Sequence, residues 1–202
     1  MDLVGSVAMA AGLAWASGLR LYAVLFLAGL LGRFGYVDLP ESLQVLSHWL
    51  VLGASGFMFV VEFFADKVPA LDSLWDALHT FIRVPAGAVL AAMALGNHDP
   101  AIIVAGAILG GTLAAGTHLT KAGSRALINT SPEPFTNVAA SVGEEALVIG
   151  GLYAALHHPL VFLALLAAFV LLVAWLLPKL WRGVRQVFRR LSGTAQETGA
   201  NA

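Results

Sequence analysis

Cysteine is absent from the 202 residues of this chain, and charged residues are scarce, at 11% of the total. The first absence excludes disulfides, thiolate catalysis, iron–sulfur clusters and cysteine-ligated zinc. The second, beside 59% hydrophobic residues and a mean hydropathy of +0.84, excludes a water-soluble fold, because the polar residues are too few to cover the apolar surface. Motifs of zinc proteases, α/β-hydrolases and phosphate-binding loops are also absent from the sequence.

Long apolar runs predict an all-α membrane bundle. Residues 160–177 read LVFLALLAAFVLLVAWLL, an uncharged run about long enough to cross a 30 Å hydrocarbon core. Turn-forming residues divide the chain into six expected transmembrane helices, at residues 4–31, 43–64, 74–95, 101–127, 135–156 and 160–177. No Lys or Arg precedes the first run, which indicates a retained span rather than a cleaved signal peptide. Residues 1–178 are therefore expected to form one transmembrane domain.

Positive charge gathers after the last apolar run. Residues 179–191, KLWRGVRQVFRRL, alternate basic and apolar positions at helical spacing and predict an amphipathic helix on an anionic membrane surface. The small polar residues 192–202 predict a disordered tail. Because cytoplasmic flanks carry the excess of Lys and Arg, six spans place both termini in the cytoplasm, and the opposite face holds Arg33 alone.

A weak internal repeat relates two Pro-containing turns and their flanking helices. Residues 62–78 align with residues 125–139, so that Glu62 matches Arg125 and, further on, Arg83 matches Glu144. Each copy is a helix, a polar turn and a second helix with one deep charge, in parallel orientation. A twofold arrangement of the copies is expected to bring opposite charges together. A chance match between apolar sequences is the alternative.

Five ionisable residues fall well inside the expected spans, several of them roughly 15 to 18 Å from the nearest turn. They are Arg20, Arg83, His118, Glu144 and Glu145. A charge at such depth costs about 2.5 to 3.5 kcal/mol on insertion scales, so each needs a partner, water or a protein-lined cavity. The group predicts a polar pathway. The alternative is structural: paired charges that lock helices together, or Arg83 bound to carbonyls at a kink or break near Pro85 and Gly87.

A second polar group lies nearer the turns, in Glu62, Asp66, Lys67, Asp72, Asp76 and His79 of the first copy and Lys121, Arg125, Asn129, Ser131, Glu133 and Asn137 of the second. Helical spacing places Glu62 with Asp66 on one face, and Asp72, Asp76 and His79 on another. Since hard cations take oxygen ligands and transition metals take imidazole, these five residues are the candidate metal ligands. A solvated loop, or contact of Lys121 and Arg125 with an anion or lipid headgroup, remains open.

Three segments carry a resemblance to a known family. They are ASGLRLY at 16–22, ADKVPALDSLWDALHTFIRVPAGA at 65–88, and HLTKAGSRALINTSPEPFTNVAASVGEE at 118–145. Together they resemble a widespread bacterial family of small integral membrane proteins catalogued as a domain of unknown function. The resemblance implies a multi-pass protein of the inner (plasma) membrane and brings no activity or catalytic residue.

Three functions remain open, and transport of a small solute or ion is the leading interpretation. The expected pathway comprises Arg20, Glu62, Asp66, Asp76, Arg83, His118, Lys121, Arg125, Asn129, Asn137, Glu144 and Glu145. The others are an intramembrane enzyme acting on a lipid through Asp72, Asp76 and His79, and a non-catalytic scaffold. A wet cavity reaching Arg83 and Glu144 favours transport, a surface cleft at Asp76 and His79 favours chemistry, and dry paired charges favour a scaffold.

The expected partners are the lipid bilayer, a small solute or ion, and further copies of the chain, with no nucleic acid. No cofactor is evident, and a bound cation is the one candidate.

Overall fold

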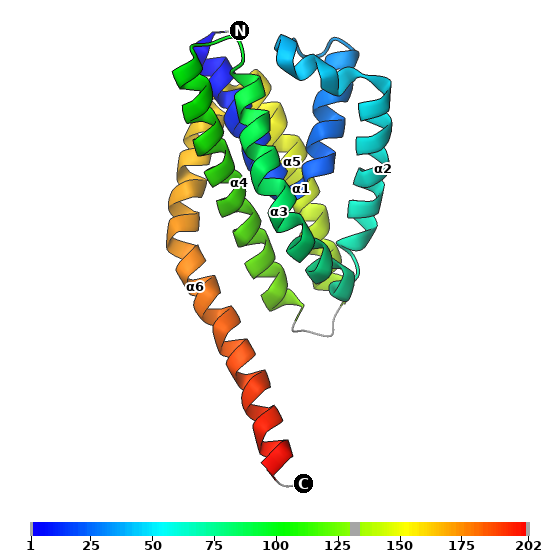
Figure 1. The fold of residues 1–202 in the computed structure, drawn as a ribbon, viewed down its shortest axis with the longest axis vertical. Coiled ribbons are helices and arrows are strands. Elements are labelled where there is room, and N and C mark those ends of the chain that lie inside the picture. The colour runs from blue at the N-terminus through cyan, green and yellow to red at the C-terminus, as the bar shows by residue number, and fades with distance from the viewer. Residues whose placement is uncertain (1, 130–133, 201–202) are drawn as a thin grey trace.

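A computed structural model of the protein describes residues 2–129 and 134–200, and these residues form helices and turns without a strand. The helices are α1 (Leu3–Arg33), the 3₁₀ helix η1 (Glu41–Ser47), α2 (Trp49–Ala65), α3 (Pro69–Ala94), α4 (Pro100–Ile128), α5 (Pro134–His157) and α6 (Pro159–Ala200). The predicted all-α membrane bundle is confirmed (Figure 1). By length and composition, α1, α3, α4, α5 and α6 suit a membrane span, and η1 with α2 is a sixth candidate.

Proline marks the start of four helices: Pro69, Pro100, Pro134 and Pro159. Its fixed φ suits the first helical turn, and the N–H that proline lacks would find no partner within the helix there. The polar interruptions of the sequence therefore fall at helix ends. Pro85, in contrast, lies inside the continuous helix α3, so no break occurs at Pro85 or Gly87.

The second expected span, residues 43–64, is divided into two helices. His48 separates η1 from α2 with extended backbone (φ −71°, ψ 139°), and the two helices are bent by 66°. The His48 Nδ1 atom accepts a hydrogen bond from the Leu50 N–H at 3.3 Å and so caps α2. In Figure 1, η1 lies across one end of the bundle, and α2 alone runs along it.

Helix α1 breaks at Arg20 and folds back on itself. Arg20 has φ −146° and ψ 87°, between two helical arms. Met9 and Leu13 of the first arm line the same small cavity as Ala28 and Leu31 of the second, whereas a straight helix would hold residues 9 and 31 about 33 Å apart. Figure 1 shows both arms rising to the same end of the bundle. α1 is therefore a re-entrant hairpin with Arg20 at its tip, not the straight span expected over residues 4–31.

Because α1 is a hairpin and not a straight span, the first and last helices reach opposite ends of the bundle. Leu3 begins α1 at the end of the bundle that also holds η1, and α6 extends past the opposite end (Figure 1). The expectation that both termini share a side counted six crossings. Because α1 returns to its starting end, only the five passes α2 to α6 remain, and an odd number separates the two ends. Hydropathy counts apolar residues and does not register the reversal.

Helix α6 continues beyond its apolar part. It includes residues 179–191, whose position on the membrane surface stays a prediction, and residues 192–200, for which the sequence predicted a disordered tail.

The re-entrant hairpin makes a prediction about sidedness that the cysteine-free chain is suited to test. We expect Asp2→Cys, at the cap of α1, and Asp38→Cys, before η1, to react with an impermeant maleimide from the same side of sealed vesicles. Arg182→Cys, on α6, should react only from the other side, because five passes separate it from Asp38. Detergent-opened vesicles give the full labelling for each variant. Reaction of Asp2→Cys and Arg182→Cys from one side would contradict the hairpin.

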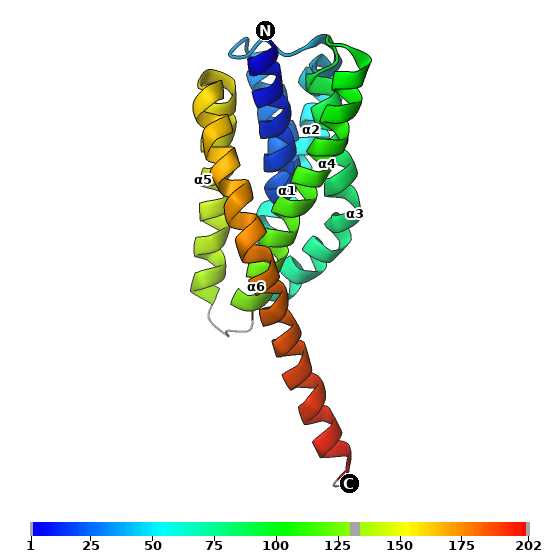
Figure 2. The same ribbon diagram turned by 90° about the vertical axis from the view of Figure 1, so that its left-hand side faces the viewer.

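The hairpin forms the centre of the bundle and packs against η1 and all five other α-helices. Figure 2 shows it with α5 on one side and α4 on the other. Small residues permit the close approach: a Cβ atom at Gly18 would lie 2.8 Å from the Cβ of Thr117 on α4. Helix α4 therefore packs closely against the hairpin at Gly18, two residues before Arg20 at its tip.

Candidate functional site

The tip of the hairpin lies among charged side chains from α2, the α2–α3 turn, α3, α4 and α5. We call this set the charge cluster: Arg20, Glu62, Asp66, Lys67, Asp76, Arg83, Lys121, Arg125, Glu144 and Glu145. Arg20, Glu62, Asp66 and Arg83 are completely buried. The structure therefore brings together charges that are far apart in the sequence, as the cost of burying them requires.

Asp66 joins the hairpin tip to α4. Its Oδ2 atom lies 2.9 Å from Arg20 Nη2 and 2.9 Å from Lys121 Nζ. Burial raises the pKa of the Asp66 carboxyl, but Lys121 and Arg20 outweigh burial and bring the pKa below its ordinary value. Lys121 also donates to the Leu19 carbonyl at 3.2 Å. A cation thus caps the carbonyl end of the first α1 arm, where the helix dipole favours positive charge.

Arg83 organises the buried side of α3. Its Nη2 lies 2.8 Å from Glu62 Oε1, and its Nη1 lies 3.0 Å from both Asp76 Oδ1 and His118 Nδ1. Because a guanidinium only donates hydrogen bonds, His118 Nδ1 accepts from Arg83, and the proton of the imidazole ring is on Nε2. His118 Nε2 then donates to Thr80 Oγ1 at 2.8 Å. His118 is a hydrogen-bonded contact between α3 and α4 in this conformation.

Glu144 faces three cations. Arg125 donates to it through Nε and Nη2 at 2.9 and 3.1 Å, a bidentate pair. The Glu144 Oε2 atom also lies 3.5 Å from Lys121 Nζ and 3.7 Å from Arg20 Nη2. Arg125 Nη1 donates to the backbone and side-chain oxygens of Asn137 as well. The guanidinium of Arg125 therefore links α4 to two turns of α5.

Glu145 and Lys67 form the more exposed edge of the cluster, each with a side chain 21% exposed. Glu145 Oε1 lies 3.5 Å from Arg20 Nη2 and 3.7 Å from Lys67 Nζ. Burial lowers the pKa of Lys67, and the neighbouring Glu145 carboxylate offsets only part of that decrease. Ser141 accepts from Arg20 Nη2 at 2.7 Å and from Lys67 Nζ at 3.3 Å. This edge is the side from which the cluster is accessible.

Ser141 was not among the predicted site residues. The signal was present in the sequence, because Ser141 lies three and four residues before Glu144 and Glu145 and so shares their helix face.

Opposite charges pair both within each hairpin of the proposed repeat and between the copies, where Lys121 contacts Asp66 and Asp76 and Lys67 contacts Glu145. Glu62 and Arg83 join α2 to α3, and Arg125 and Glu144 join α4 to α5. The second pair occupies the matching positions with the signs reversed. The repeat itself stays a prediction.

The candidate metal ligands are engaged in other contacts. Three of them, Glu62, Asp66 and Asp76, face arginine or lysine. Asp72 accepts from Asn129 Nδ2 at 3.0 Å. Within residues 2–129 and 134–200, no three His, Asp or Glu side chains converge as a metal site. Two further predicted polar residues, Ser131 and Glu133, lie outside the described residues.

His79 belongs to an aromatic cluster. Its Nδ1 donates to the Trp75 carbonyl at 2.8 Å, so its Nε2 accepts from the Tyr22 hydroxyl at 3.2 Å. The ring also stacks on Trp75, with centroids 4.2 Å apart. These contacts fix His79 against the second arm of α1, and Asp76 is occupied by Arg83. The arrangement gives no support to an acid–base pair of Asp76 and His79.

Several buried polar atoms of the cluster have no hydrogen-bond partner in the described part of the chain. They are Arg20 Nε and Nη1, Glu62 Oε2, Asp66 Oδ1, Asp76 Oδ2, Arg83 Nε and Glu145 Oε1. An unsatisfied buried polar group costs about 1 to 3 kcal/mol. The cluster therefore has unused capacity for water, protons or a bound solute.

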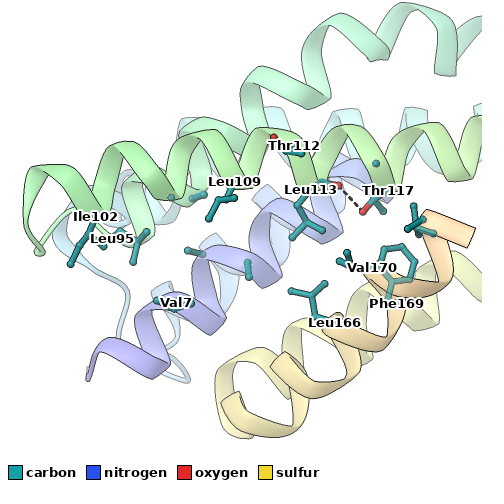
Figure 3. Close-up of a pocket in the computed structure, with 18 residues that line it drawn as sticks. Val7, Leu95, Ile102, Leu109, Thr112, Leu113, Thr117, Leu166, Phe169 and Val170 are labelled. Atoms are coloured by element: carbon teal, nitrogen blue, oxygen red, sulfur yellow. Dashed lines mark hydrogen bonds between the residues drawn. The ribbon is translucent and has the colours of Figure 1, made fainter. Parts of the chain in front are cut away.

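A groove of about 530 Å³ opens between the first α1 arm, α3, α4 and α6 (Figure 3). Its lining is almost entirely apolar and includes Val7, Leu95, Leu109, Leu113, Leu166 and Phe169. Thr117, which donates to Leu113 O at 2.9 Å, is one of its few polar residues. No charged side chain lines the groove, so it is not the wet cavity that would favour transport.

A protein-family model matches residues 7–179 of the chain. The matched range contains most of the re-entrant hairpin and the whole charge cluster, and the match confirms the resemblance noted in the sequence. No curated protein and no solved structure matches the chain.

Proposed function

We propose that this chain, which belongs to the family described as Domain of unknown function (DUF4126), transports a small solute or ion. The family description assigns no activity, so the proposal rests on the charge cluster. The break of α1 at the cluster carries the proposal. Non-helical backbone at membrane depth is tolerated only inside protein or beside a water-filled cavity. Transporters place such helix breaks at their substrate sites.

Shared carboxylates support a moving rather than a fixed network. Asp66 Oδ2 contacts both Arg20 and Lys121, and Asp76 Oδ1 contacts Arg83 at 3.0 Å and Lys121 at 3.5 Å. Each carboxylate keeps one cation if the other moves away. Removing the only partner of a buried charge costs about 3 to 5 kcal/mol, and sharing avoids that cost. A gate that opens and closes needs partners that exchange in this way.

The basic residues assign the sides of the membrane in this proposal. The α2–α3 turn, which contains Lys67, lies at the end of the bundle past which α6 extends, and Lys179 and Arg182 belong to α6 beyond its apolar part. In this proposal that end therefore faces the cytoplasm of the bacterial inner membrane. Along α3 and α5, Asp76 and Glu144 lie about 11 and 15 Å from the helix starts at this end. The cluster then closes the cytoplasmic half of the bundle.

Lys121→Met tests transport without breaking the fold. The substitution removes the ammonium that connects three carboxylates, yet Asp66 retains Arg20, Asp76 retains Arg83 and Glu144 retains Arg125. In sealed proteoliposomes with imposed gradients of common cations, anions or protons, we expect wild type to carry flux. The variant should carry about tenfold less.

The matched control is Lys179→Met, whose exposed ammonium lies over the Trp175 ring and outside the cluster. It should retain wild-type flux, and thermal unfolding in detergent should show all three proteins folded. Equal flux in wild type and Lys121→Met would show that the charge cluster is not part of the transport path.

A non-catalytic scaffold is the second candidate, and one observation favours it. The cluster charges are paired and mostly buried, and the apolar groove does not reach them. A scaffold would use the charges only to fix helix register. Absence of flux for every gradient in wild type, with Lys121→Met merely less stable, would favour this function over transport.

A further inference from the structure

We propose that Arg20, Lys121 and Arg125 bind a phosphate-type anion, and that the Glu144 carboxylate occupies their site until the anion displaces it. The inference rests on the proposed transport function and names the chemical class of its solute. Either a free phosphate or the phosphate of a lipid headgroup presents this chemistry. A small cation is disfavoured there, because three positive side chains converge on the same position.

The contacts of Glu144 define the site. Arg125 holds the carboxylate through two parallel N–H groups at 2.9 and 3.1 Å. Arg20 and Lys121 approach its Oε2 atom from the hairpin and from α4, at 3.7 and 3.5 Å. The bidentate arginine fork matches phosphate as well as carboxylate, and lysine adds a point charge. Glu144 thus holds the position that an oxyanion would take.

Unused donors belong to residues that contact this site. Arg20 Nε and Nη1 are buried and lack hydrogen-bond partners in the described chain, and so does Asn137 Nδ2 beside Arg125. Arg20 is completely buried and Asn137 is 1% exposed. A glutamate carboxylate has two oxygens, whereas phosphate has an additional oxygen acceptor and a tetrahedral shape. A phosphate-type anion would satisfy donors that Glu144 leaves unpaired.

Charge balance indicates how many carboxylates a bound phosphate-type anion displaces. The charge cluster has five cations and five carboxylates, so it is neutral with all of them ionised. If Glu144 and Glu145 leave, the remainder has two positive charges, and phosphate carries about −1.5 to −2 at neutral pH. Binding therefore restores neutrality without a co-transported ion.

Exposure points to the same two carboxylates. Glu144 and Glu145 have side chains 13% and 21% exposed, whereas Glu62 and Asp66 are completely buried. Both glutamates lie on α5, and Glu145 is next to Lys67 at the accessible edge. They can rotate outward to solvent or headgroups at lower cost than the buried carboxylates, which would leave their cations unpaired inside the bundle.

Binding by the purified protein in detergent tests the inference separately from transport. Inorganic phosphate and a short-chain phosphatidic acid are titrated in parallel, with short-chain phosphatidylcholine as the neutral-headgroup comparison, and affinity is measured by calorimetry. We expect Glu144→Gln to bind one of the two phosphate probes about tenfold more tightly than wild type, since the internal competitor loses its charge. Arg125→Gln should bind it about tenfold more weakly.

Two controls separate the site from surface charge. Arg182→Gln removes an exposed cation of α6 and should bind as wild type does, whereas binding lost in this variant would move the anion site to the basic tail. Glu41→Gln removes an exposed carboxylate and should give no gain. If Arg125→Gln does not fold, the gain in Glu144→Gln remains decisive, and an unchanged or weaker affinity in that variant overturns the proposal.

The probes also separate the two sources and the two proposals. Binding of inorganic phosphate supports a free solute, and binding of phosphatidic acid alone supports a lipid headgroup. Tighter binding in Glu144→Gln without flux in proteoliposomes would support the site and contradict transport. Flux without any gain in binding would support transport and contradict the site.

Discussion

Arg83→Ala is expected to lower the free energy of unfolding by about 3 to 5 kcal/mol. Arg83 is completely buried and pairs with Glu62 at 2.8 Å and Asp76 at 3.0 Å. Asp76 retains Lys121 at 3.5 Å, but Glu62 is left inside the bundle without another cation among its described ion pairs. Reversible unfolding in mixed micelles, followed by the emission of the five tryptophans, measures the loss.

The double variant Glu62→Met with Arg83→Met distinguishes a lost contact from an unpaired charge. Replacing a whole buried ion pair by apolar side chains of similar size is often neutral or stabilising. We therefore expect the double variant to recover most of the stability that Arg83→Ala loses. Arg33→Ala is the control, since Arg33 is exposed and its contacts in the described residues are the Ser47 carbonyl and the Trp49 ring, and should cost about 0.5 kcal/mol or less. A similar small cost for Arg83→Ala would contradict the buried network.

The gathering of the deep charges could be predicted from the sequence because its cause is energetic. A chain with few charges cannot leave Arg83 or Glu144 alone in hydrocarbon, so finding them in long apolar runs already indicates partners. The limits of α4 followed closely from the sequence, since the expected span starts one residue after Pro100, whereas α3 begins at Pro69, five residues before the expected start. The identity of the partners did not follow, because whether Arg83 takes Glu62 or Glu144 depends on packing that spacing does not encode.

The hairpin of α1 was not predictable by hydropathy. Residues 4–31 form one run of spanning length, with mainly apolar residues on both sides of Arg20. The only local signals are Ser17, Gly18 and Arg20 itself, which the sequence analysis read as a deep charge within a span. The contacts that accompany the turn are tertiary and are shared among several residues: Lys121 caps the carbonyl of Leu19, and Asp66 and Ser141 contact the Arg20 side chain. The prediction that both termini are cytoplasmic also counted α1 as a single crossing.

Arg20→Gln is expected to abolish most transport while leaving the protein folded. Arg20 is the residue at which α1 turns, and its Nη2 atom contacts Asp66, Ser141, Glu144 and Glu145. Its backbone lies in the extended region that any residue adopts, so the substitution introduces no strain. Asp66 keeps Lys121, and Glu144 keeps Arg125. Flux in proteoliposomes should fall about tenfold or more, with a modest decrease in the unfolding temperature.

Arg20→Lys separates the charge of Arg20 from its shape. Lysine restores the positive charge, but one ammonium cannot present the planar fork whose Nε and Nη1 atoms remain free for a solute. We therefore expect Arg20→Lys to recover the unfolding temperature fully and the flux only in part. Arg33→Gln, at the exposed end of α1, should leave both unchanged. Full flux in Arg20→Gln would show that the hairpin tip only fixes helix register, and the fold would then match the scaffold.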